Sequence, residues 1–173
     1  MKFMSMDQSS GKFALAIFED EKLIDYKYYD LIFYLGKDSP IEQRISATKE
    51  LMLRAIKEYN VEMVVLEDIF LRTTKFSPYA GYNSFKTLAK LLGVLENALY
   101  ELEILSMPVK ASVWRATCKI KGKGGVQKDN AVKFVVDKFG LSDTIEVDTA
   151  EAICLGWHTA KKIIPKVRKK WVN

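Results

Sequence analysis

The first third of the chain carries its apolar residues in three short runs separated by polar turns. These runs cover residues 2–6, 13–19 and 22–34, and the second and third are joined at Asp20 and Glu21. Apolar runs of this length, rich in aromatic and β-branched residues and bounded by turn residues, predict β-strands. The chain is therefore expected to begin with strands joined as hairpins.

A helical pattern follows, and a further strand comes after it. Ser39, Pro40 and Glu42 stand in the order of an N-cap, a first helical residue and a capping-box partner. Apolar or small residues then recur at helical spacing as far as Asn60. The next run, VEMVVLED at residues 61–68, is short and β-rich, and it predicts a buried strand that ends in two acids.

The second half of the chain alternates helical and extended patterns. A leucine-rich face predicts a helix capped by Asn83 or Ser84, and a strand and two more helices follow it; we place these four elements at residues 84–100, 102–109, 127–139 and 148–164. Gly140 and Pro165 stand where helices commonly end. This order of elements predicts an α/β fold, with a mixed five-stranded sheet flanked by helices.

Two connecting segments have the composition of loops. Residues 69–83 are aromatic and basic, and residues 119–130 contain three glycines and four lysines. The second segment is expected to be solvated and mobile. Because 173 residues is the length of one domain, we expect a single domain over residues 1–173.

Basic residues are concentrated in the C-terminal half. The chain has 27 Lys and Arg against 22 Asp and Glu, a net charge of +5. Eight Lys or Arg lie between Pro108 and Lys138, and a basic C-terminal tail from about residue 161 has six more and no acid. A solvated surface explains either run alone, but together they favour a polyanionic partner such as nucleic acid.

Cysteine and histidine are too few and too far apart for a zinc site. Cys118, Cys154 and His158 are the only such residues, whereas a structural zinc ion needs four ligands at short paired spacings. No apolar run reaches 18 residues, and the N-terminus has no apolar signal core. We therefore expect a cytoplasmic protein that is not associated with a membrane.

Carboxylates stand at the ends of three separate predicted elements. Asp7 ends the first strand, and Glu67 lies near the end of the fourth. Asp148 and Glu151 share one face of the first turn of the last helix. Each has an ordinary explanation, because Asp7 can start a turn and Asp148 can cap its helix with Glu151 at the third position. Strand ends and a covering helix can nevertheless converge, and converging carboxylates repel one another unless a cation neutralises them.

Such a cluster would offer oxygen ligands only. An all-oxygen ligand set selects hard divalent cations, so Mg²⁺ is the expected ion and Mn²⁺ an expected substitute. Two such ions held by shared carboxylates can activate water for in-line attack on a phosphodiester. Beside a basic half-molecule, the substrate would be a nucleic-acid backbone.

The order of three motifs resembles the RuvC family of Holliday junction resolvases, in the RNase H-like superfamily. The motifs are MDQSSG around Asp7, VVLEDIF around Glu67 and VDTAEAICLG around Asp148, and the likeness extends over nearly the whole chain. The resemblance implies an RNase H-like sheet with helices on both faces. It implies a homodimer that cuts four-way junctions, and other branched DNA such as forks and three-way junctions, by symmetric two-metal hydrolysis. Two Mg²⁺ ions would be bound by Asp7, Glu67, Asp148 and Glu151.

The resemblance also assigns DNA contacts. Phe70 matches the family aromatic that stacks at the junction centre. Lys110 and Lys128 match basic residues near the scissile phosphate, and Lys128 would have a catalytic role. Further lysines of the basic connecting segments are expected to contact DNA as well: Lys75, Lys119, Lys121 and Lys123.

Three features depart from the family pattern. The family usually has Asp-Pro-Gly after the first strand, whereas Gln8 follows Asp7 here, and Glu151 stands in place of the usual Asp. The lysine-rich segment at residues 119–125 is also longer than usual. These departures are typical of a divergent, phage-type member in a bacterial host cell. They leave open any dependence on the branch-migration partners RuvA and RuvB.

Two other functions remain open from the sequence. An RNase H-type ribonuclease shares the fold but takes its second carboxylate from the first helix, where this chain has Glu50 and Glu58. A non-cleaving module that binds branched DNA is the other alternative, although a set of acids hinders DNA binding unless it holds a cation. The leucine-rich face of residues 84–100 is a candidate dimer interface, or else part of the core.

Overall fold

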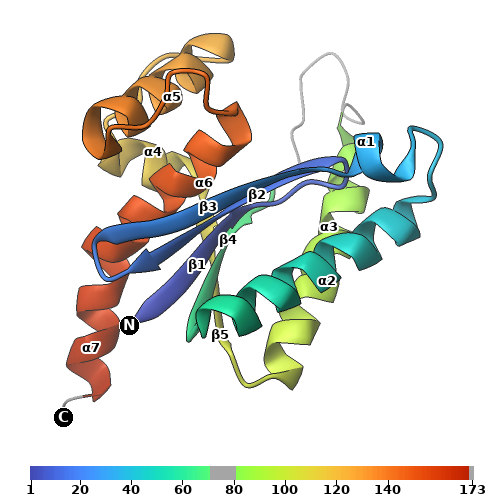
Figure 1. The fold of residues 1–173 in the computed structure, drawn as a ribbon, viewed down its shortest axis with the longest axis horizontal. Helices are drawn as coiled ribbons and strands as arrows, with labels where there is room; N and C mark the ends of the chain where they lie inside the picture. Colours follow the sequence, from blue (N-terminus) through green and yellow to red (C-terminus); the bar gives the residue numbers. More distant parts are fainter. Residues whose placement is uncertain (71–80, 172–173) are drawn as a thin grey trace.

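A five-stranded mixed sheet forms the centre of the molecule (Figure 1). The computed structural model describes residues 1–70 and 81–171. The strands, in chain order, are β1 Lys2–Asp7, β2 Lys12–Glu19, β3 Lys22–Asp30, β4 Met63–Asp68 and β5 Leu105–Lys110. Their order across the sheet is β3-β2-β1-β4-β5. The first three are antiparallel neighbours, whereas β4 pairs in parallel with both β1 and β5, which confirms the predicted mixed sheet.

Helices cover both faces of this sheet (Figure 1). Their bounds are α1 Leu31–Leu35, α2 Ile41–Tyr59, α3 Tyr82–Glu101, α4 Ala111–Thr117, α5 Gly125–Phe139, α6 Val147–His158 and α7 Ile164–Trp171, with a π-helical turn between the last two. Helices α2 and α3 pack on one face, and α4, α5 and α6 pack on the other, so each face has its own buried core. The predicted α/β arrangement is confirmed. Among the described residues, no helix combines the length and the apolar character needed to cross a membrane.

The alternation of side chains along β1 decides which of them face α6. Phe3 is buried in the core on the α6 side, and Ser5 bonds to α6 itself. Asp7 lies two residues further along the strand and therefore belongs to the same face. Met4 and Met6 point the other way, into the core beneath α2 and α3. The carboxylate that ends β1 is thus directed toward α6.

Helix α6 packs very closely on the sheet. Gly156 makes this possible, because a Cβ atom there would lie 2.3 Å from Cε2 of Phe18 and 2.7 Å from Oγ of Ser5. The Ser5 hydroxyl is fully buried and donates a hydrogen bond to the Ala152 carbonyl oxygen at 2.7 Å. These contacts hold the middle of α6 against β1 and β2, so that the first turn of α6 lies near the end of β1.

Two boundaries predicted in the first half are wrong. Strand β3 ends at Asp30 rather than at residue 34, because the Asp30 carboxylate accepts a hydrogen bond from the Phe33 backbone N–H at 3.0 Å and caps α1. Helix α2 is not capped by Ser39. Pro40 occupies the N-cap position without a side-chain cap, and the Ser39 hydroxyl instead donates to the Gly36 carbonyl oxygen at 2.7 Å.

Besides α1, the sequence pattern missed helix α4, and it misplaced the start of α3. Helix α4 follows β5 directly and carries Trp114, which is fully buried. Helix α3 begins after Gly81, which has a φ of 83°, and not at Asn83 or Ser84. Glycine adopts this left-handed conformation without strain, so it can turn the chain into the helix without a capping side chain.

Helices α5 and α6 also begin earlier than predicted. Helix α5 starts at Gly125, so the second half of the segment expected to be a loop, residues 119–130, is helical. Its end at Gly140, in the left-handed conformation, is confirmed. The N-cap residue of α6 is Glu146 rather than Asp148. Asp148 therefore lies inside the first turn, where its carboxylate is not used as a cap.

The last helical segment continues through Pro165, where an end was predicted. A π-helical turn, Thr159–Ile163, precedes this residue, and the Ile164 N–H bonds to the carbonyl oxygen of Thr159, five residues earlier. In a regular α-helix the proline ring would clash with the carbonyl group four residues before it. The wider turn relieves this clash, so the chain continues into α7.

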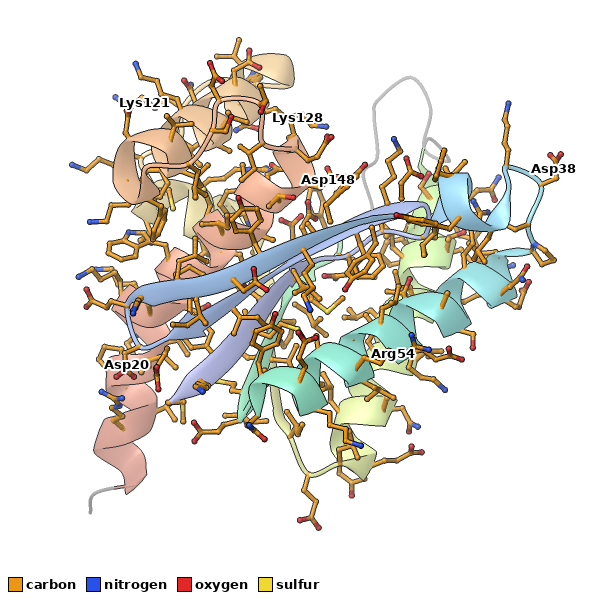
Figure 2. All side chains as sticks on the ribbon, viewed as in Figure 1. Asp20, Asp38, Arg54, Lys121, Lys128 and Asp148 are labelled. Atoms are coloured by element: carbon orange, nitrogen blue, oxygen red, sulfur yellow. The ribbon has the colours of Figure 1, made fainter. Side chains whose placement is uncertain are left out.

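The predicted basic tail is helical as far as Trp171, the last described residue, and it pairs with the turn between β2 and β3. Lys161 pairs with Glu21 at 2.6 Å, and Arg168 pairs with Asp20. Both acids lie in the turn between β2 and β3, and Figure 2 shows Asp20 at the end of the sheet remote from Asp148. Two of the basic residues are therefore neutralised within the molecule.

Replacing Gly156 by alanine should destabilise the protein. The added methyl group has no space between α6 and Phe18, and overpacking of this kind costs about 1–3 kcal/mol. Thermal unfolding followed by circular dichroism measures the effect. Gly93→Ala is the matched control, because a Cβ atom at this position inside α3 would meet nothing within 4 Å. The control should be as stable as the wild type or slightly more stable. Equal stability of the two variants would contradict the close packing of α6.

Candidate metal centre

Three carboxylates meet at the end of β1. One oxygen atom from each of Asp7, Asp148 and Glu151 lies within 4.8 Å of the others. Asp7 ends β1, and the other two residues lie near the start of α6, where Figure 2 labels Asp148. A spacing of three residues places both helical side chains on one face, which is the face toward Asp7. The structure thus brings together three of the four carboxylates that the sequence singled out.

The surroundings of Asp7 oppose a negative charge. Burial raises the pKa of the Asp7 carboxyl well above its usual range, and the charges of Glu67, Glu151 and Asp148 raise it further. Lys128 on α5 acts in the opposite sense. Burial also raises the pKa of Asp148, and Lys128 again opposes the shift. Without a cation, a proton on Asp7 relieves the repulsion between these carboxylates. A cation bound among them would neutralise the same repulsion.

Glu67 approaches the cluster from β4. Met63 and Val65 are buried on the α6 side of the sheet, so Glu67, two residues further on, belongs to that side. Its Oε2 accepts a hydrogen bond from Nε1–H of Trp114 at 2.9 Å. Glu67 is not one of the three residues whose oxygens lie within 4.8 Å of one another. After burial, however, its charge contributes most to the raised pKa of Asp7, so it lies beside the cluster.

Gln8 joins the ends of β1 and β4. Its side chain is buried, with Nε2 donating to the Glu67 carbonyl oxygen at 2.5 Å and Oε1 accepting from the Glu67 backbone N–H at 3.1 Å. These bonds continue the pairing of the two strands, which in the backbone extends to Met6 and Leu66. Gln8 thereby fixes the spacing between Asp7 and Glu67. From the sequence it stood out only as a departure from the Asp-Pro-Gly of the family.

Helix α4 brings a second side chain to the site. Arg115, next to Trp114, donates from Nη2 to Oε1 of Glu151 at 3.0 Å. Its guanidinium group lies over the Trp114 ring, 4.7 Å from the ring centroid. Sequence reasoning missed both residues. The available signal was the helical spacing of the buried residues Ala111, Trp114 and Cys118, which spans only two turns.

The residues predicted to contact DNA differ in their relation to this cluster. Lys128 is close enough for its charge to oppose the raised pKa of Asp148. Phe70 and Lys110 line a groove of about 790 Å³, and Arg115 lies in the same groove. The Phe70 side chain is 59% exposed.

The remaining predicted contacts are lysines of the connecting segments. Lys119, Lys121 and Lys123 are exposed. Figure 2 shows Lys121 well to the left of Lys128 and farther from Asp148 in the view. Lys75 lies outside the described residues. The structure therefore associates Lys128 with the carboxylates, and the DNA contacts of the other lysines remain predictions.

The donor set of the cluster fits a hard divalent cation. Asp7, Asp148 and Glu151 offer carboxylate oxygens only. In residues 1–70 and 81–171, no other group of three or more acidic, histidine or cysteine side chains is arranged to hold an ion. Oxygen ligands of this kind select Mg²⁺ or Mn²⁺ over softer metals. The chemistry and the raised pKa of Asp7 both fit a site completed by a cation.

Solved structures share this fold, although no protein-family model and no curated protein sequence matches the chain. RuvC from Thermus thermophilus, in complex with a Holliday junction substrate, is 13% identical, with a TM-score of 0.72 over 92% of both chains. The Fowlpox virus resolvase, in complex with Holliday junction DNA, is 15% identical, with a TM-score of 0.62 over 95% of this chain and 99% of that one. The yeast mitochondrial Holliday junction resolvase Ydc2 is 15% identical, with a TM-score of 0.55 over 96% of this chain and 81% of that one. The chain therefore has the fold of RuvC and other Holliday junction resolvases, as its motifs predicted.

Proposed function

We propose that this chain is a metal-dependent endonuclease that cuts four-way DNA junctions. The observation that carries the proposal is the convergence of Asp7, Asp148 and Glu151 on a fold that Holliday junction resolvases share. Two of those resolvases, RuvC from T. thermophilus and the Fowlpox virus protein, were solved with Holliday junction DNA. Their likeness to this chain supports branched DNA as its substrate.

The carboxylates have the role of metal ligands in this proposal. Asp7, Asp148 and Glu151, with Glu67 beside them, would hold two Mg²⁺ or Mn²⁺ ions. When bound, such ions supply an activated water and stabilise charge on phosphate oxygens. The protein's own contribution is to fix these side chains on β1, β4 and α6. Because the groups are already in place, little reorganisation is needed when the substrate binds.

Side chains beside the carboxylates can bind the DNA backbone and an unpaired base. Lys128 is exposed on α5 and lies near Asp7, so it can donate to a phosphate oxygen next to the cluster. Lys110 lines the adjoining groove. The exposed ring of Phe70, in the same groove, offers a surface on which an unpaired base can stack. This combination suits DNA whose strands are separated at a branch, including forks and three-way junctions.

Paired cutting requires two copies of the site. A four-way junction has near two-fold symmetry, so a C₂ homodimer would place one site on each of two strands of like polarity. The leucine-rich face of α3 is not the interface, because Leu91, Leu95 and Leu99 are fully buried in the core of this chain. The proposed dimer would therefore use another surface.

The geometry favours this proposal over an RNase H-type ribonuclease. Such an enzyme takes its second carboxylate from its first long helix. The corresponding helix here is α2, which carries Glu50 and Glu58. Helix α2 covers the face of the sheet opposite to α6, and Glu58 pairs with Lys27 at 2.6 Å. The carboxylate beside the cluster is Glu67, at the end of β4. That is the arrangement that the resemblance to resolvases implies.

Asp7→Asn should abolish cleavage while retaining junction binding. Loss of one carboxylate from the cluster removes several kcal/mol of transition-state stabilisation, which corresponds to a decrease in rate of about 10³-fold or more. Cleavage of an end-labelled synthetic four-way junction in Mg²⁺ measures the rate, and gel-shift titration in Ca²⁺ measures binding. The wild type should make paired symmetric nicks that EDTA prevents.

Asp38→Asn is the matched control for this assay, because Asp38 is exposed and Figure 2 shows it at the right edge of the molecule, well away from Asp148. The control should cut at the wild-type rate. A junction that the wild type binds but never cuts would favour the non-cleaving binding module. Cutting confined to an RNA/DNA hybrid would make the protein a ribonuclease.

Asp7→Asn should also stabilise the metal-free protein. Because folding raises the pKa of Asp7, ionisation of this group destabilises the fold increasingly as the pH rises from the usual carboxyl range through the raised pKa. In EDTA at pH 8 the variant should therefore melt above the wild type, by about 2–4 °C for each kcal/mol gained. The difference should shrink as the pH falls toward about 4.

Scanning calorimetry with and without Mg²⁺ gives both comparisons, with Asp38→Asn again as the control. Mg²⁺ should raise the melting temperature of the wild type and of the control more than that of Asp7→Asn. Identical melting of the wild type and Asp7→Asn in EDTA at pH 8 would refute a repulsive environment around Asp7.

A further inference from the structure

Two adjacent residues of α4 each contact a different carboxylate of the site. Trp114 donates from Nε1–H to Oε2 of Glu67 at 2.9 Å. Arg115 donates from Nη2 to Oε1 of Glu151 at 3.0 Å. Glu67 belongs to β4 and Glu151 to α6. One short helix therefore links a carboxylate of the sheet to a carboxylate of the helix that covers it.

Both contacts are sheltered from solvent. Trp114 is fully buried, and a buried indole N–H requires an acceptor, which here is Glu67. The side chains of Arg115 and Glu151 are only 23% and 10% exposed. The guanidinium group of Arg115 also stacks on the Trp114 ring, at 4.7 Å from its centroid. A displacement of either side chain would thus disturb both carboxylates.

These contacts restrict the rotation of the two carboxylate side chains, which packing alone would not do. Packing of the Trp114 ring in the core would be equally good with any hydrogen-bond acceptor for its N–H. Here the acceptor is the Glu67 carboxylate, and the bond limits rotation of that carboxylate. Glu151 stands where the resolvase family usually has aspartate, and its side chain has one more rotatable bond. The bond from Arg115 removes part of that additional freedom.

We propose that Trp114 and Arg115 are positioning residues that hold Glu67 and Glu151 in the orientation that binds the divalent cation. The inference rests on the proposed function of the same site. The alternative is that the positive charge of Arg115 competes with the metal ion for Glu151, and the two roles predict opposite effects when Arg115 is replaced. Loss of a competing charge would tighten metal binding, whereas loss of a positioning contact weakens it.

Mn²⁺ binding in the absence of DNA tests the proposal without relying on cleavage. Electron paramagnetic resonance measures free Mn²⁺ during titration of the wild type, Trp114→Phe and Arg115→Met. Phenylalanine keeps an apolar ring but lacks the N–H, and methionine keeps an apolar stem but lacks the guanidinium group. The dissociation constant should rise about 10- to 100-fold in each variant, the range typical of groups that orient metal ligands.

Trp157→Phe is the matched control for loss of packing. Trp157 packs against the same core as Trp114, and its ring contacts Phe139 and Lys138 rather than a carboxylate. This variant should bind Mn²⁺ as the wild type does. Equal weakening in Trp114→Phe and Trp157→Phe would mean that a loosened core causes the effect, and it would overturn the role of Trp114. Unchanged or tighter binding by Arg115→Met would overturn the role of Arg115.

A double-mutant cycle tests whether Trp114 acts through Glu67. Trp114→Phe introduced into Glu67→Gln should weaken Mn²⁺ binding much less than it does in the wild type. Equal weakening in both backgrounds would contradict the proposal. Junction cleavage, measured in parallel, should show a lower kcat with KM little changed for both Trp114→Phe and Arg115→Met.

Failure of the inference can be told apart from failure of the proposed function. A wild type that neither binds Mn²⁺ nor cuts junctions would overturn the proposed function, and this inference with it. A wild type that binds and cuts, beside variants that bind equally well, would overturn the inference alone.

Discussion

Asp148 and Glu151 reach Asp7 only because α6 lies so close to β1 and β2 that a side chain at position 156 has no space. A hydrogen bond from Ser5 to the backbone of α6 holds the helix at this distance. Since Ser5 and Asp7 share one face of β1, the contact that orients the helix also aims its first turn at the carboxylate that ends the strand. The geometry of the candidate site is therefore a consequence of how one helix packs on one sheet.

Close packing creates an electrostatic cost that the chain only partly offsets. Burial and the neighbouring carboxylates raise the pKa of Asp7, and Lys128 opposes that shift without cancelling it. Arg115 bonds to one carboxylate of the group, and Trp114 bonds to Glu67 beside it. A divalent cation is the natural complement of such an arrangement, because it neutralises the remaining repulsion and is itself bound by oxygens that are already in place. The same cation would supply the chemistry of the proposed nuclease.

The sequence was sufficient to predict the sheet, its two helical layers and the meeting of Asp7 with Asp148 and Glu151. Apolar strand runs and helical periodicity predicted the sheet and its flanking helices, and acids at element ends made a carboxylate cluster possible. Helices on both faces and a site shared by Asp7, Asp148 and Glu151 were implied by the resemblance to resolvases. The sequence was not sufficient for α4 or for the bonds made by Gln8, Trp114 and Arg115. Those bonds join residues up to 59 positions apart, and nothing in a short pattern identifies the partner. The capping of α1 by Asp30 and the passage of the last helix through Pro165 were missed for a different reason: in both places a less common local geometry replaces the usual one.

Anomalous X-ray diffraction from crystals of the wild type grown with Mn²⁺ tests the central claim most directly. We expect anomalous density bonded to carboxylate oxygens of Asp7, Asp148 and Glu151, with Glu67 beside it. Mn²⁺ bound only elsewhere on the protein, with these carboxylates in contact with one another and with no ion, would contradict the account.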